Sequence, residues 1–163
     1  MHTKAPTYII NFVHNGKAIS FDPSEYQALG ENPQESFEAA IKQYSVSAFW
    51  LSTMRKRKRV AEQEICVYAG RLYHQLKIDG GYAAKYKGSR PTEESLKQAI
   101  WDDKTYRELS TTLSDLEEIV DQLWGIQKTV ERKFEAIKEI CALTRSAQYK
   151  PAGARAEMYE ETH

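Results

Sequence analysis

Long hydrophobic runs are missing from this sequence of 163 residues. No stretch approaches the roughly 20 apolar residues that a membrane-spanning helix requires, and no apolar run follows Lys4 as in a secretory signal. Cysteine is scarce. Cys66 and Cys141 lie far apart and lack metal-ligand spacing, so we expect reduced, buried thiols in a cytoplasmic protein.

The chain also has no net charge at pH 7, because its 23 Lys and Arg residues balance its 23 Asp and Glu residues. The charges are unevenly distributed along the chain. Residues 55–90 contain 10 basic and 3 acidic side chains, whereas residues 91–163 contain 10 basic and 15 acidic ones. A polyanion responds to local potential, so the central segment can bind phosphates although the whole chain is neutral.

Glycine and proline are absent between Pro33 and Gly70, which leaves room for a long helix. Asn32-Pro33 is a helix start, and helical periodicity continues to about Ile78. The apolar stripe of this helix comprises Phe37, Ile41, Tyr44, Ala48, Leu51 and Met54, and then Ala61, Ile65, Tyr68, Leu72 and Leu76. Between these two groups the basic run 55–59 places positive charge all round the helix.

A second long helix is predicted near the end of the chain. Thr92 caps a short helix, and Asp102 or Asp103 begins a new one. Its seam follows an unbroken 3-4 spacing through Tyr106, Leu109, Leu113, Leu116, Val120, Leu123, Gln127, Val130, Phe134, Ile137, Cys141 and Thr144. Such a seam is typical of a coiled coil. We expect Gln127 to face the basic run in a polar layer.

The first residues of the chain are expected to form a β-hairpin. Residues 8–13 and 18–21 have the pattern of strands, and Asn15-Gly16 between them is a signal for a tight turn. The predicted fold is therefore mainly α: a long antiparallel helical hairpin with a coiled-coil seam and a short N-terminal β-hairpin. Its parts are the β-hairpin and linker (1–31), the helical hairpin (32–146) and a disordered tail (147–163). Apolar residues off the seam, such as Trp124 and Ile140, predict an oligomer.

Catalytic constellations are not found in the sequence. The four histidines have no Cys, Asp or Glu at ligand spacing, and no glycine-rich loop carries the Lys and Ser of a phosphate-binding loop. The paired acids Asp102-Asp103 and Glu117-Glu118 are more simply explained as a helix cap and a solvated face than as catalytic groups. We therefore expect a protein that is not an enzyme and that holds neither a cofactor nor a metal.

Basic and aromatic side chains alternate in the central segment, a combination that suits single-stranded nucleic acid. Cations follow the phosphate backbone, while aromatic rings stack on unpaired bases. The predicted nucleic-acid-binding residues are Arg55, Lys56, Arg57, Lys58, Arg59, Arg71, Lys77, Tyr82, Lys85, Tyr86, Lys87 and Arg90. The alternatives are a localisation signal, an acidic protein partner or a merely solvated face.

Residues 37–145 resemble the phage recombination mediator proteins of the UvsY type. The resemblance lies in Trp50-Leu51 followed by the basic run, in the aromatic, glycine-containing segment 82–88, and in a third stretch. That stretch begins with Lys97, Ile100, Asp103 and Lys104. It leads without a gap into a long amphipathic helix that contains Trp124-Gly125 and residues 134–140. The N-terminal hairpin and the tail have no counterpart.

The resemblance implies a ring-like homo-oligomer that binds single-stranded DNA and displaces the single-strand-binding protein. It also implies that the oligomer loads a RecA-like recombinase onto the DNA, in the host cytoplasm if a phage encodes the chain. A second hypothesis is a coiled-coil adaptor, scaffold or inhibitor that binds no nucleic acid. Its basic run would meet an acidic protein surface, and its hairpin would bind by strand addition.

Overall fold

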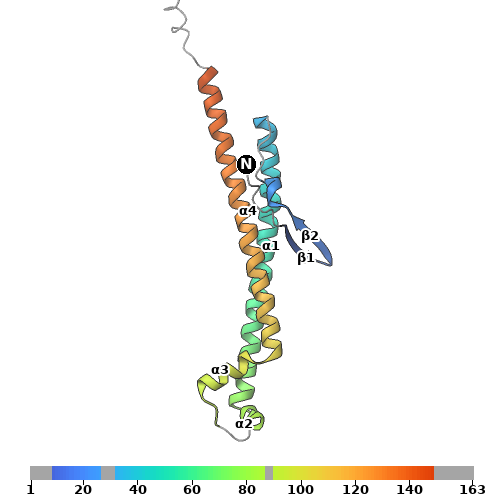
Figure 1. Cartoon of the computed structure of the whole chain (residues 1–163), viewed down its shortest axis with the longest axis vertical. Helices are drawn as coiled ribbons and strands as arrows, with labels where there is room; N and C mark the ends of the chain where they lie inside the picture. Colours follow the sequence, from blue (N-terminus) through green and yellow to red (C-terminus); the bar gives the residue numbers. More distant parts are fainter. Residues whose placement is uncertain (1–8, 27–31, 87–89, 149–163) are drawn as a thin grey trace, which may run out of the picture. The chain divides into compact units, whose positions relative to one another are not determined.

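The computed structural model describes residues 9–26, 32–86 and 90–148. This part of the chain is mainly helical, with a two-stranded sheet at its start (Figure 1). The elements are β1 (Ile10–His14), β2 (Lys17–Phe21), a 3-10 helix η1 (Pro23–Tyr26), α1 (Pro33–Lys77), α2 (Gly81–Lys85), α3 (Glu93–Trp101) and α4 (Lys104–Gln148). The predicted mainly α fold is confirmed. Of the predicted tail 147–163, residues 147 and 148 belong to α4, and the rest lies outside the described residues.

Strands β1 and β2 form the predicted antiparallel hairpin, in which Ile10 pairs with Phe21 and His14 with Lys17. The turn residues Asn15 and Gly16 have φ angles of 49° and 73°, and asparagine and glycine are the residues that adopt this left-handed region most readily. Alternation turns one face inward: the cross-strand pair Ile10 and Phe21 is buried, and so is Phe12, which pairs with Ile19.

Helix α1 begins and ends at the signals that the sequence carries. The Asn32 side chain accepts a hydrogen bond from the Gln34 backbone N–H at 3.0 Å, as a helix cap does. At the other end Gly80 has a φ of 72°, and a Cβ at Gly81 would lie only 2.8 Å from the Gln75 carbonyl oxygen. The chain therefore leaves α1 through two positions that favour glycine, Gly80 for its backbone angle and Gly81 for lack of space.

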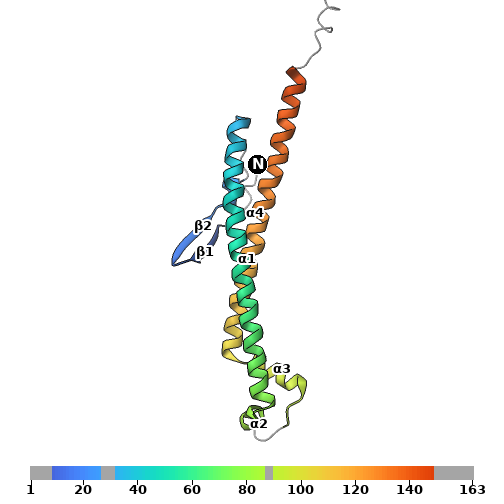
Figure 2. The ribbon, with the colours of Figure 1, turned by 180° about the vertical axis from the view of Figure 1, so that it is seen from behind.

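The connection between the long helices contains α2 and α3 (Figure 2). Thr92 caps α3, because its side chain accepts a hydrogen bond from the Ser95 backbone while Ser95 accepts one from the Thr92 backbone. Leu96 of α3 is fully buried in a cluster with Leu76 of α1. The helical restart is also confirmed, because the Tyr106 N–H donates to the Asp103 carboxylate at 2.9 Å at the start of α4.

The described residues belong to two compact units. Unit 1 comprises Met1–Ala48 and Gly125–His163, and unit 2 comprises Phe49–Trp124. Within each unit a part of α1 packs against a part of α4, and the two parts run antiparallel. In unit 1 the contacts are Phe37 with Phe134 and Tyr44 with Gln127. In unit 2 they are Lys58 with Glu117 and Tyr68 with Asp103.

The seam of unit 1 contains a polar layer. The Gln127 side-chain amide donates to the Tyr44 hydroxyl at 3.0 Å, and the Lys133 ammonium donates to the Gln43 side-chain oxygen at 3.2 Å. Gln43 in turn donates to the backbone carbonyl of Glu25 in η1. The expected layer thus exists, but the partner predicted for Gln127 was wrong: it is a tyrosine, because the register sets Tyr44 opposite it.

The buried face of α1 in unit 1 differs from the predicted stripe. Phe37 and Ile41 are exposed, whereas Ser36, Ala40 and Ser47 are buried. This part of α1 has η1 as a neighbour in addition to α4, as the Gln43–Glu25 hydrogen bond shows. Two neighbours on different sides of one helix bury positions that a single seam does not select.

Lys133 is the clearest departure on α4. It is buried, and desolvation lowers the pKa of its ammonium group below the ordinary lysine value. Trp124 and Ile140 are exposed, as expected for apolar residues off the seam, and the seam residues Leu123 and Val130 are fully buried.

The cysteines are less buried than predicted. Cys66 is exposed and Cys141 is half-buried, and both are free thiols. Cys66 lies one residue past Ile65, on the side of α1 that turns away from the seam. No helix in the described ranges is long and apolar enough to cross a membrane.

Candidate nucleic-acid interface

The basic run lies in the middle of α1, between the buried residues Met54 and Ala61. Arg55, Lys56 and Arg59 are exposed, and none of the three forms an ion pair with another described residue. Arg55 and Arg59 are one helical turn apart, about 6 Å along the axis, so their guanidinium groups share one side of the helix. We call these three residues the cation cluster.

Arg57 and Lys58 complete the run but face other directions. Arg57 is exposed, and its guanidinium lies 4.0 Å from the Met54 sulfur. Lys58 is half-buried, with its ammonium 3.0 Å from a Glu117 carboxylate oxygen on α4 and 3.6 Å from Glu62. The hydrogen bond to Glu117 raises the pKa of Lys58 above the ordinary lysine value. Two carboxylates thus compensate the Lys58 charge locally.

Lys77, at the end of α1, is also paired. Its ammonium donates to a Glu93 carboxylate oxygen of α3 and to the Tyr73 hydroxyl, which in turn donates to Glu93 at 3.1 Å. These hydrogen bonds lower the pKa of Glu93 and raise the pKa of Lys77. Lys77 therefore connects α1 with α3, and little of its charge is left for a phosphate.

The two tyrosines predicted to stack on bases contact each other. The ring centroids of Tyr82 and Tyr86 are 4.4 Å apart, and the ring planes are inclined by 34°. Tyr82 also packs against the cluster around Leu96, so its ring belongs to the core of the connection. Tyr86 is exposed, and the Lys85 ammonium lies 5.5 Å from its ring centroid. Tyr86 is thus the more accessible of the two rings.

The remaining predicted residues lie elsewhere. Arg90 is exposed just before the Thr92 cap, and Lys87 lies outside the described residues. Arg71 is exposed on α1, twelve residues past Arg59, which corresponds to about 18 Å along the helix axis. The structure thus brings Arg55, Lys56 and Arg59 together, but it does not join Arg71 to them.

Arg71 lies instead at the edge of a groove of about 430 Å³ in unit 2, which we call the α1 groove. Its lining includes Val60, Glu64, Val67, Tyr68 and Arg71 from α1 and Leu109 from α4. Tyr68 is fixed at the floor, because its hydroxyl donates to Asp103 at 2.9 Å. The groove offers an apolar surface flanked by one acidic and one basic side chain.

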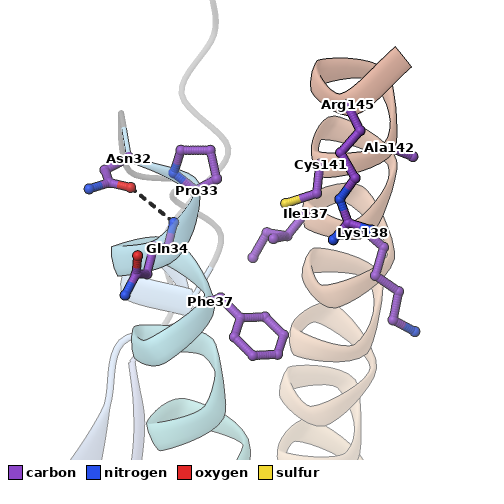
Figure 3. A pocket seen from close by; sticks show the side chains of 9 residues that line it. All are labelled: Asn32, Pro33, Gln34, Phe37, Ile137, Lys138, Cys141, Ala142 and Arg145. Atoms are coloured by element: carbon purple, nitrogen blue, oxygen red, sulfur yellow. Dashed lines mark hydrogen bonds between the residues drawn. The ribbon is translucent and has the colours of Figure 1, made fainter. Parts of the chain in front are cut away.

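A second groove, of about 620 Å³, lies in unit 1 between the start of α1 and the last turns of α4. Figure 3 shows Phe37 pointing toward α4, with Ile137 and Cys141 pointing toward α1. Lys138 and Arg145 contribute to its lining. No group of three His, Cys, Asp or Glu side chains that could hold a metal occurs among the described residues.

The acidic partners of the basic segment cannot be identified from the sequence. Glu117 and Glu93 are far from Lys58 and Lys77 along the chain, and the sequence pattern alone places Glu117 on a solvated face and Glu93 at a helix start. A helical register known to within one turn would have placed Glu117 opposite Lys58. No local signal in the sequence supplies that register.

Comparison of the chain with protein-family models, with curated proteins and with solved structures found no match. The resemblance to recombination mediators of the UvsY type therefore stays a prediction.

Proposed function

We propose that this protein binds single-stranded nucleic acid, without catalysing a reaction, through the cation cluster on α1. The observation that carries the proposal is the exposure of Arg55, Lys56 and Arg59 with no acidic partner among the described residues. Each cation without a carboxylate partner can bind a phosphate and release a counterion from it. A lysine that is already bound to a carboxylate contributes less binding free energy, because it must give up that ion pair first.

Single strands are the preferred substrate because an aromatic ring is available besides the charge. Tyr86 is exposed, and a base can take the place of the Lys85 ammonium over its ring while the displaced ammonium contacts a phosphate. The order of elements in the described part of the chain does not resemble a helix-turn-helix, a zinc finger or an OB-fold. Affinity would then come from several weak contacts, and an oligomer would multiply them.

The finer proposal is recombination mediation in the cytoplasm: a homo-oligomer of this chain holds single-stranded DNA for a RecA-like recombinase and displaces the single-strand-binding protein. It is supported by the resemblance of residues 37–145 and by the long helical hairpin. Its test is recombinase filament assembly on DNA already coated with the single-strand-binding protein. Stimulation by the wild-type chain, and none by a cation-cluster variant, is the expected result.

Binding itself is tested by fluorescence anisotropy with a labelled single-stranded oligonucleotide and its duplex, each over a series of salt concentrations. The triple variant Arg55→Gln, Lys56→Gln, Arg59→Gln removes three phosphate contacts. At about 0.7 per contact for single strands, the slope of log affinity against log salt should fall by about 2.

The matched control is Lys58→Gln combined with Lys77→Gln, which removes two paired cations from the same helix. Its salt slope should stay close to that of the wild type. An equal loss of slope in the control would show that pairing does not determine which cations bind. Absence of binding to both oligonucleotides at low salt would contradict the proposed function and favour the adaptor hypothesis.

A further inference from the structure

The solvent-facing side of α1 in unit 2 carries two large apolar side chains that nothing covers among the described residues. Val60 is 52% exposed and Val67 is 53% exposed. Seven residues, or two turns, separate them, so they lie on the same side of the helix. The α1 groove runs beside them. A regular apolar spacing of this kind, on a helix whose opposite side already packs on α4, is typical of a second helix–helix contact.

Gly70 lies one turn beyond Val67 on this side and inside the helix. A Cβ added at Gly70 would meet no atom within 4 Å. Glycine weakens a helix interior relative to alanine, so the packing of the described residues gives no reason for it. A glycine on an exposed helix face does have a use when the backbone of another helix approaches closely.

Two charged residues beside the valines, Glu64 and Arg71, would pair with those of a second α1 helix in the antiparallel orientation but not in the parallel, in-register one. Glu64 and Arg71 are also seven residues apart, and both line the α1 groove. Neither forms an ion pair or hydrogen bond with another described residue. In a parallel, in-register pair of α1 helices, Glu64 would meet Glu64 and Arg71 would meet Arg71. In an antiparallel pair centred between residues 67 and 68, each Glu64 instead faces Arg71 of the other copy.

We propose that this surface, the α1 stripe formed by Val60, Glu64, Val67, Gly70 and Arg71, binds a second copy of this chain in antiparallel orientation. Val67 lies next to the two-fold axis and contacts its equivalent in the second copy, and Gly70 allows the two backbones to approach. Two symmetry-related ion pairs between Glu64 and Arg71 flank this contact. The contact is isologous, as in most homodimers, because the same residues serve on both sides.

The dimer contact does not rest on nucleic-acid binding, and it gives Arg71 a protein partner in place of a phosphate. Arg55 lies about a third of a turn from Val67 around the helix and turns away from the stripe, whereas Lys56 and Arg59 lie about three turns before Val67 and Gly70 on the same side. Because α1 ends at Lys77, which lies opposite residue 58 in this antiparallel pair, Lys56 and Arg59 lie at the end of the contact and Arg55 stays accessible when the stripe is covered. Failure of the dimer and failure of nucleic-acid binding can accordingly be observed separately.

The test is sedimentation equilibrium of the full chain without nucleic acid, over a series of protein concentrations. Glu64→Arg alone makes all four facing charges positive, and Arg71→Glu alone makes all four negative. Each single variant should weaken the dimer at least about tenfold, because like charges then face each other. Mixing the two single variants should restore the dimer as a heterodimer, since every facing pair is again opposite in sign. Circular dichroism verifies that both variants remain helical.

Steric substitution provides an independent measurement. Gly70→Leu fills the place of closest approach and should abolish the dimer while helix content is kept or raised. Gly125→Leu is the matched control, because a Cβ at Gly125 of α4 also meets nothing within 4 Å. The control should dimerise like the wild type.

Three results would overturn the proposal. The first is a wild-type chain that stays monomeric at every concentration, which would mean that another molecule covers the stripe. The second is a mixture of the two charge variants that dissociates as readily as each variant alone. The third is an equal effect of leucine at residues 70 and 125.

Discussion

Replacing Leu123 by alanine should lower the free energy of unfolding by about 3 kcal/mol. Leu123 lies on the seam of α4 and is 0% exposed. The substitution removes three buried carbon atoms, each worth about 0.8 kcal/mol in transfer from water, and the cavity left behind adds to the loss. For a chain of this length, a loss of about 3 kcal/mol corresponds to a decrease in Tm of roughly 6–12 °C.

Leu143 supplies the matched control, because it is the same residue type on the same helix and is 69% exposed. Leu143→Ala should change the free energy of unfolding by less than about 0.5 kcal/mol, since surface substitutions have small effects and alanine suits a helix well. Urea unfolding followed by circular dichroism measures both variants. A loss below about 1 kcal/mol for Leu123→Ala, or equal losses for the two variants, would refute the packing of this seam.

Three further predictions concern caps and glycines. Asp103→Asn should make the free energy of unfolding less dependent on pH in the acidic range. The backbone N–H of Tyr106 lowers the pKa of the Asp103 carboxyl in the folded chain. The stability that Asp103 contributes is therefore present above its pKa in the unfolded chain, and it is lost as the pH falls through its pKa in the folded chain. Urea unfolding from neutral to acidic pH measures this, and an unchanged curve would contradict it. Thr92→Ala should lower stability by about 1 kcal/mol through loss of the capping box with Ser95, whereas equal midpoints in urea would argue against the cap. Gly125→Ala should raise thermal stability by up to about 1 kcal/mol, because the added methyl meets nothing, and a lower Tm would reveal a contact there.

Local signals in the sequence were sufficient for the hairpin, for α3 and for the two long helices, whereas the short helix α2 was not predicted. Asn15-Gly16 predicted the hairpin turn, Asn32 the start of α1, and Thr92 the cap of α3. Each of these signals acts within three or four residues, where backbone geometry and one side-chain hydrogen bond decide the conformation. The antiparallel course of α1 and α4 was expected because an antiparallel hairpin is the simplest fold for two long helices joined by one connection, here residues 78–103.

Contacts between distant residues could not be predicted in the same way. Ser36 is buried and Phe37 is exposed, and η1 packs beside α1 at Gln43, although no pattern within α1 encodes either feature. The pairing of Lys58 with Glu117 depends on the register of two helices to within one turn. The basic segment is therefore visible in the sequence, but which of its charges are already compensated is not.

The polar layer of unit 1 has a consequence for how the hairpin avoids wrong partners during folding. If α4 slid along α1 by one heptad, Phe134 or Val120 would replace Gln127 beside the Tyr44 hydroxyl. Ile126 or Ile140 would likewise replace Lys133 beside the Gln43 side chain. Most apolar positions would still meet apolar positions after such a slip, so hydrophobic burial alone distinguishes the two arrangements poorly. In the slipped form the buried ammonium and amide groups would lose their hydrogen-bond partners, which costs free energy. The polar layer therefore selects one register for two long, nearly repetitive helices.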